Sequence, residues 1–116
     1  MTVIQRPLTV GASRPLRARH SDRGRLWVVD LVGEADLATC ELLEAELHLA
    51  TGMGRESVVL DLTRLRFCDV YCARLILAAA STVAGATGPV RRVFEFLDPL
   101  QRVPRYQGIT DATAKH

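Results

Sequence analysis

Two short motifs in this 116-residue chain contain residue types that could do chemistry. Cys68, Asp69 and Cys72 form the pattern C-D-x-x-C, whose thiols could bind a metal or react with an oxidant. Structural zinc sites usually need two such cysteine pairs or additional histidines, and the three histidines lie far apart in the sequence. We therefore expect no metal site. A thiol near a helix start can have a lowered pKa, so a thiol redox sensor using Cys68 and Cys72 remains an alternative.

Glu34 and Asp36 form the second motif, directly after Gly33. Paired carboxylates perform general acid–base catalysis only when they converge on one pocket. Here a turn and a helix cap explain both acids. The sequence contains no Ser-His-Asp order, no P-loop and no dinucleotide-binding fingerprint. We therefore predict that the protein is not an enzyme and uses no cofactor.

The pattern of apolar residues in the first half predicts a hairpin followed by a helix. Residues 16–20 alternate apolar and charged side chains, residues 21–24 form a turn, and Leu26–Val32 is rich in strand-forming residues. Asp36 is a good N-cap for the helix that follows. Apolar residues recur in that helix at spacings of three and four, which predicts one buried stripe: Leu37, Cys40, Leu43, Leu47 and Ala50.

The second half predicts a buried strand, a helix and a segment with two readings. Ser57–Leu62 is a short apolar strand, and Asp69 stands at the N-cap position of a helix over Val70–Val83. The alternation in residues 91–96 is typical of a strand, whereas the apolar spacing in Val90–Asp98 favours a helix by a small margin. Residues 81–84 could form a short strand. This order of elements implies parallel strands joined by right-handed crossovers, in a mixed sheet packed by helices.

Three stretches resemble the STAS domain family of anti-sigma-factor antagonists. Residues 29–39 are similar to the family's strand, Gly-Glu-Leu-Asp turn and helix, and residues 58–69 to its central strand ending in aspartate. Residues 89–96 resemble its last helix. The resemblance covers about residues 16–105 and implies a STAS-type α/β fold, a mixed β-sheet packed by helices. Only sixteen residues separate Cys72 from Pro89, so the fourth strand is expected to be shortened or missing.

The segment after Asp69 departs from the family pattern. In phosphorylation-switched members this aspartate is followed by Ser, then Ser or Thr, then Gly, and the first Ser is the kinase target. Here Val70, Tyr71 and Cys72 follow. Val70 has no hydroxyl, so we expect no phosphorylation site at that position. Cys72 stands at the family's glycine position, which removes the smallest residue from the helix start.

The resemblance also implies a partner-binding surface at this helix start. Tyr and Arg are common interface anchors, although Asp69 could also be a plain N-cap. The expected partner-binding residues are Asp69, Val70, Tyr71, Cys72 and Arg74. The implied function is a protein-binding regulatory module that binds a serine-kinase-like anti-sigma factor without the serine phosphoswitch. The alternatives are a non-catalytic STAS component of a lipid-transport or stressosome-like complex, and a degenerate copy without function.

Charge is distributed unevenly along the chain. Residues 1–25 contain six arginines and one acid, a net charge of +5, whereas residues 26–116 have a net charge of −3. A basic arm can contact nucleic acid or anionic lipid. These arginines are scattered, with no lysine and no interleaved Phe, Tyr or Trp. We interpret the segment as a solvated leader and expect no nucleic-acid partner.

The length fits one domain. We predict a flexible basic leader over residues 1–13, a STAS-like domain over 14–108 and a frayed tail over 109–116. No apolar run approaches the roughly 18–20 residues of a membrane span, and the first twenty residues lack the apolar stretch of a signal peptide. We therefore expect no membrane insertion and a cytoplasmic location. The odd number of cysteines, three, argues against a disulfide framework.

Overall fold

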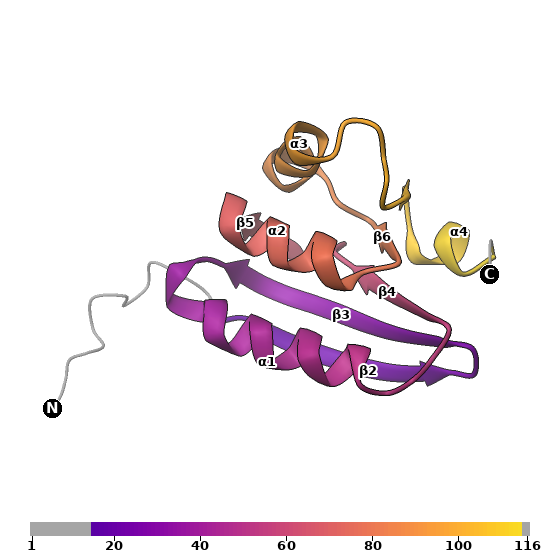
Figure 1. Cartoon of the computed structure of the whole chain (residues 1–116). Coiled ribbons are helices and arrows are strands. Elements are labelled where there is room, and N and C mark those ends of the chain that lie inside the picture. The colour runs from indigo at the N-terminus through magenta and orange to yellow at the C-terminus, as the bar shows by residue number, and fades with distance from the viewer. Residues whose placement is uncertain (1–14, 115–116) are drawn as a thin grey trace, which may run out of the picture.

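The computed structural model describes residues 15–114, so the predicted leader over residues 1–13 lies outside the described residues. Strands and helices follow one another along the chain as expected, with two further elements at the C-terminal end (Figure 1). In chain order they are β2 (Arg17–Arg23), β3 (Leu26–Ala35), the 3-10 turn η1 (Leu37–Thr39), α1 (Cys40–Thr51), β4 (Ser57–Asp61), β5 (Leu65–Cys68), α2 (Val70–Ala79), β6 (Thr82–Ala84), α3 (Gly88–Leu97), β7 (Arg105–Tyr106) and α4 (Ile109–Ala114).

One mixed sheet organises the described chain. Its strand order is β2-β3-β4-β6-β7, and β5 pairs with the far end of β3. β2 and β3 form the predicted antiparallel hairpin, although β2 continues to Arg23 and the turn is shorter than expected. Gly24 takes the left-handed conformation there, with φ of 73°. The other four pairs are parallel. The predicted mixed sheet packed by helices is confirmed, and its short strand is β6, of three residues.

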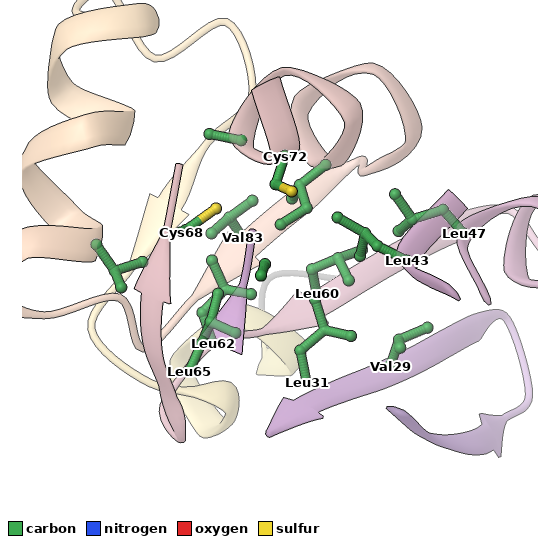
Figure 2. Packing of buried hydrophobic residues seen from close by; sticks show 14 of the residues in the cluster. Val29, Leu31, Leu43, Leu47, Leu60, Leu62, Leu65, Cys68, Cys72 and Val83 are labelled. Carbon is green, nitrogen blue, oxygen red and sulfur yellow. The ribbon is translucent and has the colours of Figure 1, made fainter. Parts of the chain in front are cut away.

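Alternating side chains of the sheet enter two cores on opposite faces, because successive residues of a strand point to opposite sides. Val29 of β3 and Leu60 of β4 belong to the main core, which α1, α2 and α3 cover (Figure 2). Their neighbours Val28 and Val59 pack in a smaller cluster with Ala112 of α4. The central strands are therefore apolar on both faces, which explains the continuous apolar sequence of β4.

The helical reading of Val90–Asp98 is confirmed, and the strand reading is wrong. Pro89 lies in the first turn of α3, where a missing N–H costs nothing. Val90 and Phe94 are fully buried, whereas Phe96 is 77% exposed. A strand would place Phe94 and Phe96 on the same face. The helix places them on different faces, so only one of the two phenylalanines enters the core.

Three further expectations need correction. Leu37 is 84% exposed, because residues 37–39 form a 3-10 turn and the buried stripe starts only in α1. α2 ends at Ala79 and not at Val83, because the next residues enter the sheet as β6. The expected frayed tail contains α4, whose Ala112 is fully buried. Its six residues are too short to show a helical period, and contact with the sheet holds them in place.

Candidate partner-binding site

Two strand-to-helix junctions lie side by side at one end of the sheet. β3 leads into η1 and β5 leads into α2, and β3 and β5 pair in parallel at their ends. The backbone N–H of Asp69 donates to the carbonyl oxygen of Ala35 at 3.0 Å. The Cys72 Sγ lies 3.7 Å from the carbonyl oxygen of Asp36. The starts of the two helical segments are therefore joined by one main-chain hydrogen bond and one contact between a thiol and a main-chain carbonyl.

Asp69 caps α2 as the sequence predicted. Its backbone is extended, with φ of −79° and ψ of 173°, and its Oδ1 accepts a hydrogen bond from the Cys72 N–H at 2.8 Å. This bond satisfies one of the amide groups that a helix start leaves without an intrahelical partner. The side chain is half-buried, so it combines a structural task with partial access to solvent.

The structure separates the five expected partner-binding residues into two groups. Val70 and Tyr71 are 43% and 54% exposed, and Arg74 one turn later is exposed as well. Cys72, in contrast, is completely buried in the main core. The prediction that Cys72 belongs to the contact surface is therefore wrong. Cys72 lies on the inner face of the first turn of α2, beneath the exposed residues.

Two exposed apolar residues of this region were missed by the sequence reading. Leu37 follows the end of β3 by two residues, and Phe67, 44% exposed, precedes Asp69 by two. The sequence did place both residues at the two strand-to-helix junctions, and this position could have identified them. They were missed because Leu37 fitted the apolar stripe of a helix and Phe67 fitted an ordinary strand. Both lie, with Val70 and Tyr71, at the end of the sheet where β3 and β5 pair, and exposed apolar residues near one another are candidates for an interaction site. We define the junction surface as Leu37, Phe67, Asp69, Val70, Tyr71 and Arg74.

Comparison with known families identifies this arrangement. The model of a family described as "Mlab, STAS domain" matches residues 19–100, which is most of the chain. The chain belongs to the STAS domain family. A search of curated proteins by sequence found no match. The expected membership and the expected STAS-type fold are both confirmed.

Solved structures share this STAS fold. An anti-sigma factor antagonist from Mycobacterium paratuberculosis superposes with a TM-score of 0.79 at 19% identity, over 86% of this chain and 92% of that one. Unphosphorylated SpoIIAA, an anti-sigma factor antagonist, gives 0.65 at 22% identity over 85% and 95%. Phosphorylated SpoIIAA from Bacillus gives 0.59 at 20% identity over 85% and 98%. These likenesses show a shared fold.

The thiols beneath the junction surface of this STAS domain are poorly suited to redox sensing. Cys68 and Cys72 are both buried (Figure 2). Burial, with a smaller contribution from the Asp69 carboxylate, raises the pKa of Cys68 to about 12. Burial, and then the neighbouring Asp69 carboxylate, also raise the pKa of Cys72. A sensor needs an accessible thiolate, so the geometry does not favour this alternative.

Residues 15–114 contain neither a cluster of metal-ligand side chains nor a membrane-spanning helix. Across residues 15–114, no three side chains of the His, Cys, Asp and Glu types come together as a metal site would require. No helix in that range has the length and apolar character needed to cross a membrane.

Proposed function

We propose that this STAS domain binds a serine-kinase-like anti-sigma factor through the junction surface, without a serine phosphoswitch and without catalytic activity. The observation that supports this is the group of exposed apolar side chains around Asp69, which includes Leu37, Val70 and Tyr71. The fold gains little from these side chains where they stand, because they remain largely in contact with water. In a complex they would be desolvated, and aromatic anchors surrounded by excluded water often dominate binding energy.

Val70 determines how such a module would be controlled. Its side chain is accessible, but it has no hydroxyl that a kinase could phosphorylate. The proposed mechanism is binding competition: an anti-sigma factor held by this module is unavailable to its sigma factor. Control would then come from the amount of the protein or from a second protein. This proposal places the protein in the cytoplasm and needs no nucleic-acid partner.

Affinity purification from the native cells, followed by mass spectrometry, tests the proposal. Wild type should capture a protein with a histidine-kinase-type ATP-binding domain, and Tyr71→Asp should not. Leu49→Asp is the matched control, because Leu49 is similarly exposed but lies on α1, outside the junction surface. Equal capture by all three proteins would contradict the assigned surface.

Phosphorylation of the captured complex tests the missing switch. After incubation with ATP, mass spectrometry should find no phosphate on residues 69–74 of wild type. The variant Val70→Ser restores a hydroxyl at the accessible position and shows whether the kinase can still reach it. Stoichiometric phosphate on residues 70–72 of wild type would contradict the proposal.

A non-catalytic component of a larger complex, of the lipid-transport or stressosome-like kind, is the second candidate function. The valine at position 70 favours it, because a permanent subunit needs no phosphorylation switch. The same purification separates the two candidates. A stable multi-subunit assembly that is retained by Tyr71→Asp would support the second, and loss of a single kinase-like partner would support the first.

A further inference from the structure

A cavity of about 690 Å³ lies at the carboxyl ends of the parallel strands β3, β4 and β6. Gly33 of β3, the turn of residues 63–64 with the first two residues of β5, and residues 87–89 at the start of α3 form most of its lining, and residues 15–17 at the start of β2 close one side. In open α/β sheets, ligands commonly bind outside the carboxyl ends of the strands. The volume is in the range of small-molecule sites.

The charge of the lining has one sign. Arg17, Arg64 and Arg66 line the cavity, and none of its lining residues is acidic. Arg64 forms an ion pair with Asp30 at 2.5 Å. Arg17 and Arg66 have no ion pair and no side-chain hydrogen bond in residues 15–114, so the fold makes no visible use of their charges. Two arginines from different strands, β2 and β5, whose charges are not paired within residues 15–114, therefore line the same cavity.

The opposite wall offers polar groups of the matching kind. Thr87, the N-cap residue of α3, makes no capping hydrogen bond within the described chain. Gly88 has φ of 55°, and no atom lies within 4 Å of the position where a Cβ would be built. A ligand can therefore approach the main chain closely here. Pro89 removes one N–H donor, so the arginines carry the recognition and this wall only supplements it.

We propose that this cavity binds a phosphate-bearing anion. A guanidinium group presents two parallel N–H donors that match the oxygens of a phosphate. The cavity is larger than a single phosphate, so the phosphate belongs to a larger group, either a soluble phosphate ester or the headgroup of an anionic lipid. This inference goes beyond the proposed function, because no lining residue belongs to the junction surface.

Titration of the 15N-labelled protein with inorganic pyrophosphate, followed by NMR, tests the site. The amide signals of Gly33, Thr63, Thr87 and Gly88 should shift and saturate. Arg66→Glu should weaken binding by about tenfold or more, as expected for loss of a charged hydrogen-bond donor. Arg23→Glu is the matched control: Arg23 is exposed, has no ion pair in the described residues, and lies at the other end of β2 from Arg17. It should leave the affinity unchanged.

Vesicles of phosphatidylcholine, with and without phosphatidic acid, distinguish the two sources of phosphate. Co-sedimentation that needs phosphatidic acid and is lost in Arg66→Glu identifies a lipid headgroup. Saturable pyrophosphate binding without vesicle binding identifies a soluble ester. The proposal is overturned if no signal saturates, if the shifts lie outside the lining, or if Arg23→Glu weakens binding as much as Arg66→Glu. None of these results depends on capture of an anti-sigma factor.

Discussion

Asp36 and Asp69 cap neighbouring helix starts, but only the Asp36 cap has hydrogen bonds in both directions between the N-cap residue and the residue three positions later. The Asp36 Oδ1 accepts from the Thr39 N–H at 3.2 Å, and the Asp36 N–H donates to the Thr39 hydroxyl oxygen at 3.0 Å. This is a reciprocal capping box. At the second junction the corresponding position is Cys72, whose thiol points into the core. The Asp69 carboxylate therefore accepts a hydrogen bond from the Cys72 N–H, but the Cys72 side chain accepts none from the Asp69 N–H.

The difference shows which residues the fold explains and which it does not. The structure fully accounts for Asp36, because its side chain and its N–H both bond to Thr39. At the second junction, capping of α2 explains the Asp69 carboxylate. Nothing in the fold explains why the apolar residues Val70 and Tyr71 stand at exposed positions. Residues left without a structural task are the better candidates for binding. Four predictions test this contrast.

The largest effect is expected in the main core beneath the two junctions. Leu43 of α1 and Ile76 of α2 are both fully buried. Leu43→Ala and Ile76→Ala should each lower the free energy of unfolding by about 2–5 kcal/mol, since each removes buried methyl groups and leaves a cavity. Urea denaturation measures this. A loss below about 1 kcal/mol for one variant alone would show that the two helices are not anchored alike.

Alkaline pH should destabilise the protein through the thiols beneath the second junction. Cys68 and Cys72 have raised pKa values when folded, so the folded state keeps their protons after the unfolded state has lost them. Stability then falls as pH rises above the ordinary thiol pKa of about 8.5, by up to about 1.4 kcal/mol per pH unit for each thiol. Denaturation at graded pH, with Cys68→Ala/Cys72→Ala as control, measures the slope.

Thiol labelling sharpens the same prediction. Cys40, at the first junction, is only half-buried, whereas Cys68 and Cys72 are buried. In the folded protein a thiol reagent should modify Cys40 first and reach the other two only after unfolding. Rapid modification of Cys72 at neutral pH would revive the redox-sensor alternative.

The caps should have smaller and unequal effects. Asp36→Ala and Asp69→Ala should each lower the free energy of unfolding by about 1 kcal/mol, with a range of 0.5–2. We expect the larger loss for Asp36, because its substitution breaks one half of a reciprocal capping box, whereas the Asp69 cap is not reciprocal. Asp36→Asn and Asp69→Asn, which keep a good cap, serve as controls. A larger loss for Asp69→Ala would contradict the contrast.

The smallest change in stability is expected on the junction surface. Leu37→Ser and Tyr71→Ser should alter the free energy of unfolding by no more than about 0.5 kcal/mol, because both side chains are already exposed. Both should nevertheless reduce partner capture. A clear loss of stability in either variant would show that the fold uses these residues after all.

Local pattern predicted much of the molecule. Asp36 and Asp69 were identified as caps from residue type and position, and both accept the expected amide bond. The β2–β3 hairpin and the buried strand β4 followed from the residue pattern, whereas periodicity only slightly favoured a helix over a strand for α3. These features depend on neighbours within a few residues, so the sequence alone contains the information that specifies them.

Contacts between distant segments decided the rest. β7 and α4 have no strong local signal, and they are held by packing against β6 and the far face of the sheet. The exposure of Leu37 and the burial of Cys72 both contradicted local expectations, because the paired ends of β3 and β5 fix which side of each turn faces the core.

The sequence by itself determined the order of the elements from β2 to α2, both helix caps and the absence of a hydroxyl at position 70. Only the tertiary structure decided which side chains form the junction surface and that Arg17 and Arg66 share a cavity with Gly88. The physical reason is that strand pairing brings together residues that are far apart in the sequence. The periodicity of apolar residues within one segment does not show which distant segment lies beside it.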